Sequence, residues 1–176
     1  MKDNAMTPYT KMALNNAWAN ATFYAALTAL SDADFNAQRP GFFPSLAATM
    51  NHIYEVDLYY IDALEEGGLG RSVYDRAPVT SAQTLAKLQA DVDHRFARFC
   101  SALKNSDLTR HVNTERKGHT ETTEEIGALV LHLVQHQVHH RGQAHVQLHD
   151  AGIAPPQLDD FHLEFGRVPS AAAYFT

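Results

Sequence analysis

The length and composition of the chain are typical of one ordinary globular domain. It has 176 residues, of which 45% are hydrophobic and 19% charged, and its formal net charge is -6 at pH 7. These values argue against a disordered, collagen-like or membrane protein, and a negative charge without a dense Lys/Arg run argues against a nucleic-acid partner. No stretch approaches the roughly 18 to 20 apolar residues of a membrane span, and residues 1–10 lack a signal-peptide pattern. We expect a single domain over residues 1–176 that is cytoplasmic and binds neither nucleic acid nor a membrane.

The cysteine and histidine content limits the kinds of site that the chain can form. Cys100 is the only cysteine, whereas there are 11 histidines, six of them between His132 and His149. An intramolecular disulfide and a Cys-based zinc knuckle are therefore excluded, and any metal must be held by histidine or carboxylate. Cys100 lies beside Phe99 on an apolar stripe, which favours a partly buried, inert thiol over a nucleophile.

The first half of the chain predicts two helices. Thr7 and Pro8 suit the N-cap and the first position of a helix, and apolar residues at three- and four-residue steps continue to about Leu30. Residues 32–41 break this pattern and predict a linker. A second helix is expected from Ser45 to the glycines at 67–68, with His52 near its middle.

The second half of the chain predicts two more helices. Residues 80–83 resemble a capping box and open the cleanest amphipathic stripe of the chain, over 85–103. The polar residues 105–120 fit either a loop or a short hairpin. Residues 122–125 offer a second capping box, for a last helix to about Asp150. Four long helices without a convincing strand pattern predict an all-α four-helix bundle, with residues 158–176 docked on it or partly loose.

The last predicted helix carries the histidines that point to a metal. Histidines four residues apart on a helix face the same side and can bind one ion. Three such pairs occur, namely His132/His136, His136/His140 and His145/His149. At about 100° per residue, His136 and His140 lie on or next to the apolar side of the helix, and the pair at 145 and 149 lies opposite, toward water. The histidines at 132 and 139 fall on the flank, where they could support the ligands from the second shell.

A third ligand is expected from another helix, because a well-held metal needs at least three protein ligands. His52 is the obvious candidate, although Glu55 and Asp57 on the same predicted helix could replace or assist it. Three neutral imidazoles would leave the ion its full charge and an open position for water or substrate. The H-E-x-x-H sequence of zinc proteases is absent, because Gln137 occupies the position of the Glu general base.

One octapeptide resembles the signature of a known family. The string from His136 to Gln143, HQVHHRGQ, is similar to the H-x-x-H-H-R-G-Q motif of the DinB/YfiT family, and Asn51-His52 in the second predicted helix is also similar to that family. The resemblance implies an up-down-down-up four-helix bundle, often dimeric, in which His52, His136 and His140 bind nickel, zinc or a similar divalent ion. It gives Arg141 and Gln143 a structural or supporting role, and we expect Arg141 to point away from the core.

The resemblance also implies a class of function. Members of the wider superfamily include transferases that use low-molecular-weight thiols, so we expect a metal-dependent transferase or hydrolase that acts on a small-molecule electrophile. The alternative is a non-catalytic metal-binding or stress-response bundle, which the same three histidines would permit. Because relatives often pair and the helices can expose a further apolar face, we expect a homodimer.

Overall fold

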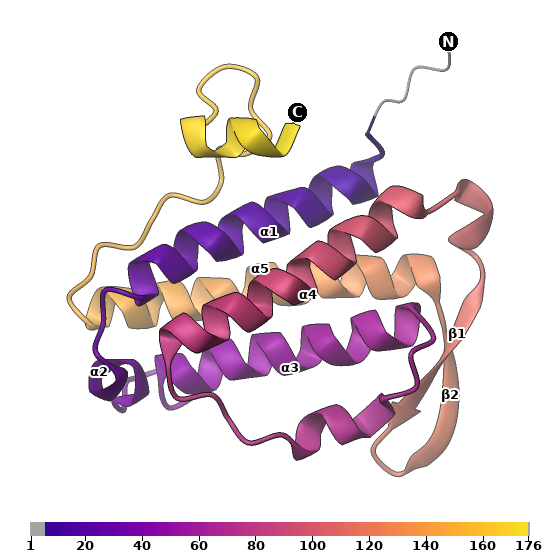
Figure 1. The fold of residues 1–176 in the computed structure, drawn as a ribbon, viewed down its shortest axis with the longest axis horizontal. Helices are drawn as coiled ribbons and strands as arrows, with labels where there is room; N and C mark the ends of the chain where they lie inside the picture. Colours follow the sequence, from indigo (N-terminus) through magenta and orange to yellow (C-terminus); the bar gives the residue numbers. More distant parts are fainter. Residues whose placement is uncertain (1–5, 176) are drawn as a thin grey trace.

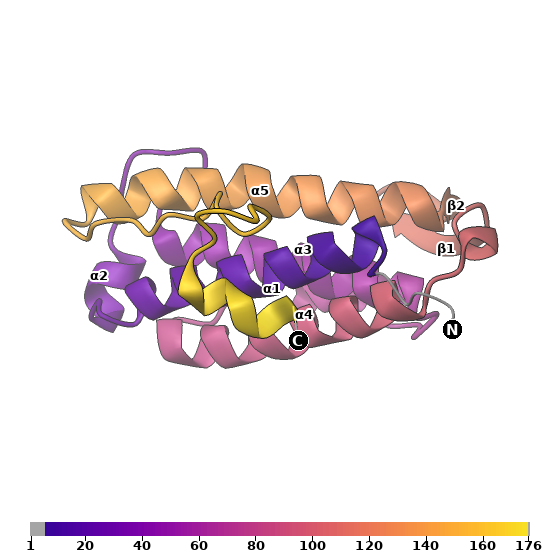
Figure 2. The ribbon, with the colours of Figure 1, turned by 90° about the horizontal axis from the view of Figure 1, so that it is seen from above.

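Four long helices form the framework of the molecule. The computed structural model describes residues 6–175, with the backbone alone at positions 119 and 120, so residues 1–5, within the stretch examined for a signal peptide, lie outside the described residues. The helices, seen side by side in Figures 1 and 2, are α1 (Pro8–Leu27), α3 (Leu46–Leu64), α4 (Ala82–Ala102) and α5 (Ile126–Asp150). Helix α1 packs mainly on α4, and α3 packs on both α5 and α4. The expected helical fold is confirmed at this level.

Short helical elements lie between the long helices or, in one case, after the last of them. They are α2 (Asp32–Asn36) and the 3-10 helices η1 (Gly70–Asp75), η2 (Asn105–Asp107) and η3 (Pro169–Phe175). Most helix starts agree with the sequence, since the hydroxyls of Thr7 and Ser45 accept hydrogen bonds from the first turns of α1 and α3. Helix α4 is capped by Ser81 and not by Thr80, whose carbonyl instead accepts a hydrogen bond from Asn36 at 2.7 Å.

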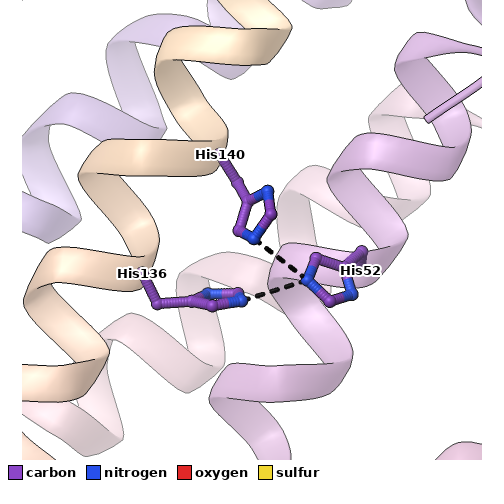
Figure 3. A group of neighbouring side chains, drawn as sticks. All are labelled: His52, His136 and His140. Carbon is purple, nitrogen blue, oxygen red and sulfur yellow. Dashed lines mark hydrogen bonds between the residues drawn. The ribbon is translucent and has the colours of Figure 1, made fainter. Parts of the chain in front are cut away.

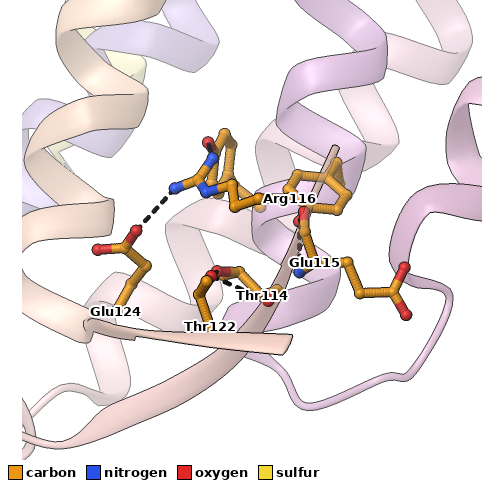
Figure 4. A network of polar contacts seen from close by, with 7 residues as sticks. Thr114, Glu115, Arg116, Thr122 and Glu124 are labelled. Carbon is orange, nitrogen blue, oxygen red and sulfur yellow. Dashed lines mark hydrogen bonds and ion pairs between the residues drawn. The ribbon is translucent and has the colours of Figure 1, made fainter. Parts of the chain in front are cut away.

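A two-stranded antiparallel hairpin joins α4 to α5, which confirms one of the two alternatives for residues 105–120. Its strands are β1 (His111–Arg116) and β2 (His119–Glu125). The second predicted capping box was wrong, because residues 122–125 belong to β2. Figure 4 shows the reason: the side chains of Thr122 and Glu124 interact across the hairpin with those of Thr114 and Arg116.

The main core lies between the four long helices, and a second, smaller cluster ties down the C-terminal segment. Phe161 and Ala171 are fully buried against Trp18 of α1, whose indole N–H donates to Ser170 at 3.0 Å. Residues 158–175 are therefore docked on α1. This contact also explains the weak amphipathic pattern of α1, since the helix is covered by α4 on one side and by the C-terminal segment on another.

Two further features bear on the expectations above. Among the described residues 6–175, no helix combines the length and the apolar character needed to cross a membrane. Cys100 is fully buried, and burial raises the pKa of its thiol to about 12. The inert thiol expected from the sequence agrees with this environment.

Candidate metal centre

Helices α3 and α5 bring the three predicted histidines together. His52 lies in the middle of α3, and His136 and His140 lie one turn apart on α5, so that all three rings converge between the two helices (Figure 3). The Nε2 atom of His52 is 3.0 Å from Nε2 of His136 and 3.2 Å from Nε2 of His140. One ligand atom from each residue lies within 4.8 Å of the others. We call this group the His triad.

The spacing of these nitrogens fits a shared transition-metal ion. Imidazole nitrogens bind such an ion at about 2.0 to 2.1 Å, so two of them lie about 2.9 Å apart in octahedral geometry and about 3.4 Å apart in tetrahedral geometry. The distances of 3.0 and 3.2 Å from His52 fall between these values. The triad could therefore hold a metal with little movement of the rings.

Hydrogen bonds alone account less well for the same contacts. Nδ1 of His140 lies 2.9 Å from Oε1 of Gln143, which is an acceptor, so this ring carries its proton on Nδ1 and directs the lone pair of Nε2 toward His52. The Nε2 atom of His52 then has at most one proton to share with two neighbouring nitrogens. A cation accepts three lone pairs at once, and the donor set thus fits a metal better than a hydrogen-bonded cluster.

The local environment keeps the triad rings neutral. Burial, followed by the proximity of His140, lowers the pKa of His52 to about 4, and burial followed by the neighbouring histidines lowers that of His136 to about 3. Burial also lowers the pKa of His140. Only neutral imidazole binds a metal, so protons compete with the ion at lower pH than they would for a free histidine.

Neighbouring side chains contact two rings of the triad, those of His52 and His140. Gln143 contacts Nδ1 of His140 through Oε1 and reaches Nε2 of His139 through Nε2 at 3.1 Å. The ring of Phe43 lies against His52 and His140, with centroid distances of 4.6 and 5.6 Å. The supporting role expected for Gln143 agrees with its contact to His140, whereas no pattern in the sequence indicated a role for Phe43.

The other histidines of α5 lie where the helical pattern placed them, with one exception. The exposed rings of His132 and His139 flank the triad, at centroid distances of 5.9 Å from His136 and 4.8 Å from His140 respectively. His149 is exposed, as expected. His145 was predicted to face water but is half-buried, because it stacks on Phe23 of α1 and its Nε2 atom lies 3.2 Å from the Pro156 carbonyl.

The expectation that Arg141 points away from the core was wrong. Its side chain is buried between α5, α1 and α4, and only 5% of the residue is exposed. Its guanidinium donates to Oδ1 of Asn16 and of Asn20, both at 2.9 Å, and to Oε1 of Gln137 at 3.2 Å. Helix α5 packs on α3 with one side and on α1 with the next, so its buried arc is wider than the apolar residues alone indicate.

Arg141 belongs to a buried polar network that also contains two carboxyl groups. Asn20 donates to both oxygens of Asp93 at 3.0 Å, and Gln89 donates to Asp93 at 3.1 Å and to Asp57 at 2.8 Å. Burial raises the pKa of Asp93 to about 7 and raises that of Asp57 well above its ordinary value. Asp57 therefore faces this interior network and not the triad, which removes it from the candidate ligands.

Two surface pockets of similar size lie at opposite ends of α3. One, of about 390 Å³, is lined by His52, Phe43 and Glu55 among others, and so adjoins the triad. The other, of about 350 Å³, lies by the hairpin, is lined by residues such as Tyr59 and Glu115, and contains no triad residue. Of these two pockets, the first is the one that borders a residue of the triad.

Comparisons with known proteins agree with the fold and the motif. The family model described as "DinB family" matches residues 1–167. The chain belongs to the DinB family. It is 22% identical over 150 residues to "Protein DinB" of Bacillus subtilis, covering 82% of this chain and 86% of that protein. The crystal structure of a DinB-like protein from Bacillus cereus superposes with a TM-score of 0.61 at 22% identity, covering 80% of this chain and 90% of that one.

The roles of several residues of this DinB family site could not be predicted from the sequence alone. Phe43 lies in a loop that the sequence marks only as a break between helices. Gln147, whose Nε2 donates to the carbonyl of Phe43 at 2.8 Å, is in the sequence only a further polar residue of a helix. Asp57 was considered as a metal ligand and Asp93 was not singled out, yet both are buried in the interior network. Only their contacts across helices reveal what they do.

Proposed function

We propose that the His triad of this DinB family protein binds one divalent transition-metal ion, with nickel or zinc as the expected ion. The convergence of three neutral Nε2 atoms, two of them 3.0 and 3.2 Å from the third, is the observation that carries the proposal. His52, His136 and His140 are the proposed ligands. Three protein ligands leave at least one position open for water or a substrate, as in catalytic zinc sites.

We further propose that the protein is a metal-dependent enzyme, a transferase or hydrolase that acts on a small-molecule electrophile. An ion bound by the triad would act as a Lewis acid and lower the pKa of a coordinated water or thiol. The chain itself contributes orientation, since Gln143 holds the ring of His140 and Phe43 packs against the rings of His52 and His140. A low-molecular-weight thiol as co-substrate rests on the family resemblance alone.

Metal titration of histidine variants tests the proposed ligands. His52→Ala, His136→Ala and His140→Ala should each nearly abolish nickel or zinc binding in isothermal titration, because each removes one of three coordinate bonds. His132→Ala and His139→Ala should weaken it by about 10- to 100-fold, as expected for supporting residues. His145→Ala and His149→Ala are the controls and should keep full stoichiometry. Full affinity in His140→Ala would refute the site.

A turnover screen separates the enzyme from a non-catalytic metal-binding or stress-response bundle. The metal-loaded protein should convert at least one electrophile in a panel with water or common thiols, and the metal-loaded His145→Ala control should do the same. The His140→Ala variant should not. Absence of metal-dependent turnover together with full metal binding would favour the non-catalytic alternative.

We also infer the up-down-down-up order of the four long helices. Asn36, which precedes α3, donates to the carbonyl of Thr80, which precedes α4, and this supports a common end for the starts of both helices. The connection between them runs back along the molecule (Figure 1). Spin labels at positions 44 and 83, in a Cys100→Ala background, should lie closer together than labels at 66 and 83, and the reverse order would exclude this arrangement.

We propose, finally, that the protein is a homodimer paired through the outer side of α5. Leu131, Val138 and Val146 are 50, 57 and 66% exposed and follow one side of this helix. The family resemblance supports pairing. Light scattering should give twice the 19.5 kDa chain mass, and Val138→Glu should halve it, whereas Leu163→Glu on the C-terminal segment should not. A wild-type monomer at micromolar concentration would contradict the proposal.

A further inference from the structure

The pocket beside the His triad has the size of a small-molecule site. Its volume of about 390 Å³ lies near the lower end of the range of ligand pockets, about 300 to 1,000 Å³. Its walls come from the loop before α3, the first half of α3 and the segment before α4. The apolar part consists of Phe43, Ala47, Ala48, Pro78 and Val79. His52 borders both this pocket and the triad, so a molecule in the pocket would lie next to a metal held there.

Hydrogen bonds to buried side chains hold two walls of the pocket in place. Gln147 of α5, which is 2% exposed, donates to the carbonyl of Phe43 at 2.8 Å and accepts from Thr49 at 2.7 Å. On the opposite wall, the amide of Asn51 both accepts from the N–H of Val79 and donates to its carbonyl, each at 2.8 Å. The pocket is thus built before any ligand arrives, which lowers the entropy cost of binding.

One carboxylate in the pocket has no partner of its own. Glu55 lies one turn after His52 on α3 and is half-buried, and it forms no hydrogen bond or ion pair with another residue within the described range 6–175. Arg76 attracts it only weakly, since burial outweighs this attraction and raises the pKa of the Glu55 carboxyl. A desolvated carboxylate without a partner gains most from a cationic ligand that donates a hydrogen bond.

Building on the proposed metal centre, we propose that this pocket binds a small organic ammonium compound. Its ammonium group contacts Glu55, its apolar part lies between Phe43 and Val79, and its other end offers an anionic or lone-pair donor to the metal beside His52. His52 and Glu55 lie about one helical turn apart on α3, so a dication held by the triad and this carboxylate would together match a ligand with opposite charges at its two ends. A ligand with a carboxylate in place of the ammonium would face Glu55 with like charge.

Binding of three thiol probes to the cobalt-loaded protein tests this assignment. Cysteamine, 2-mercaptoethanol and 3-mercaptopropionate present the same sulfur donor but end in a cationic, a neutral and an anionic group. Thiolate binding to cobalt is followed by the charge-transfer absorption. Because the thiols differ in acidity, the readout is the affinity of each probe for the wild type divided by its affinity for Glu55→Gln, which cancels that difference.

The expected ratios differ in direction among the probes. The ratio for cysteamine should be about ten, since one partly buried charge-assisted hydrogen bond is lost. The ratio should be about one for 2-mercaptoethanol and below one for 3-mercaptopropionate. Glu164→Gln removes the same charge from an exposed position outside the pocket and should give ratios near one for all three. Equal ratios for the three probes in Glu55→Gln would overturn the inference.

A second variant tests the pocket independently of Glu55. Ala48 lies one turn before His52 and lines the pocket, so Ala48→Phe should reduce the affinity of all three probes while cobalt still binds with full stoichiometry. Unchanged probe affinities in this variant would also overturn the inference. Failure of cobalt to bind the wild type would instead refute the metal centre itself, and the two failures are therefore distinguishable.

Discussion

Two neighbouring sides of α5 differ in whether the protein itself supplies a cation. His136 and His140 present neutral rings at the half-buried junction with α3. The lone pairs of these rings are available to a cation bound from solution. Gln137 and Arg141, each one residue further along, point into the interior, where the guanidinium donates to buried amide oxygens. One step of about 100° along a helix thus separates a site open to an ion from a network that carries its own cation.

The comparison teaches that one signature motif can serve two purposes. In the string from His136 to Gln143, the histidines form the candidate metal centre, whereas Arg141 joins α5 to α1 through Asn16 and Asn20. The interior network holds the helix in the rotation that directs both histidines toward His52. Loss of the network should therefore affect the fold first, and loss of the histidines should affect the metal first.

The largest expected effect is on stability, in Arg141→Met. Removing the guanidinium leaves the side-chain oxygens of Asn16, Asn20 and Gln137 without their donor, and leaving buried acceptors unpaired costs about 1 to 3 kcal/mol. The free energy of unfolding in urea should fall by that amount. Arg98→Met, at an exposed position of α4, is the control and should change it by at most about 0.5 kcal/mol. A loss below about 1 kcal/mol in Arg141→Met would show that the network is not needed for the fold.

The next largest effect is expected in Gln143→Leu, which should lower metal affinity without lowering stability. This change removes the acceptor at Nδ1 of His140, and such supporting contacts are worth about 10- to 100-fold in metal affinity. Isothermal titration should show that loss, while the free energy of unfolding without metal should change little. Gln135→Leu, on an exposed part of the same helix, should leave metal affinity unaltered. Equal affinities in the two variants would mean that Gln143 does not orient His140.

The smallest effect is the opposite pH dependence of the two regions in the metal-free protein. The pKa of His52 is lowered from 6.5 to about 4, so its contribution to stability is present above pH 6.5 and is lost as the pH falls toward 4. The pKa of Asp93 is raised from 3.8 to about 7, so its contribution is present below pH 3.8 and is lost as the pH rises through 7. Between these values the two contributions oppose each other.

Two variants should isolate the pH-dependent contributions of His52 and Asp93 to stability, because each variant removes one contribution and leaves the other. His52→Gln should make stability fall more steeply as the pH rises from 4 to 7, and Asp93→Asn should make it fall more steeply as the pH is lowered over the same range. Urea unfolding in the presence of a chelator at several pH values measures both, and each variant is the control for the other. Slopes that change in the same direction in both variants would contradict the assignment.

The sequence by itself determined the helices and the candidate ligands. Period-3.6 patterning and the caps at Thr7 and Ser45 located the helices to within a few residues, because these signals depend on neighbours along the chain. The four-residue spacing of His136 and His140, together with the apolar side of their helix, selected from three pairs the one that the structure places beside His52. The octapeptide and Asn51-His52 carried the family resemblance that the comparisons bear out.

Only the tertiary structure decided which polar residues face the interior and which line the pocket. Arg141 is buried because α1 covers a second side of α5, and residues 122–125 form a strand because their side chains pair with β1 instead of capping a helix. The side chain of Asp57 lies in the buried polar network and that of Glu55 lines the pocket, although the two residues are two positions apart on α3. Such choices depend on contacts between segments far apart in the chain, which local patterns of charge and hydrophobicity do not encode.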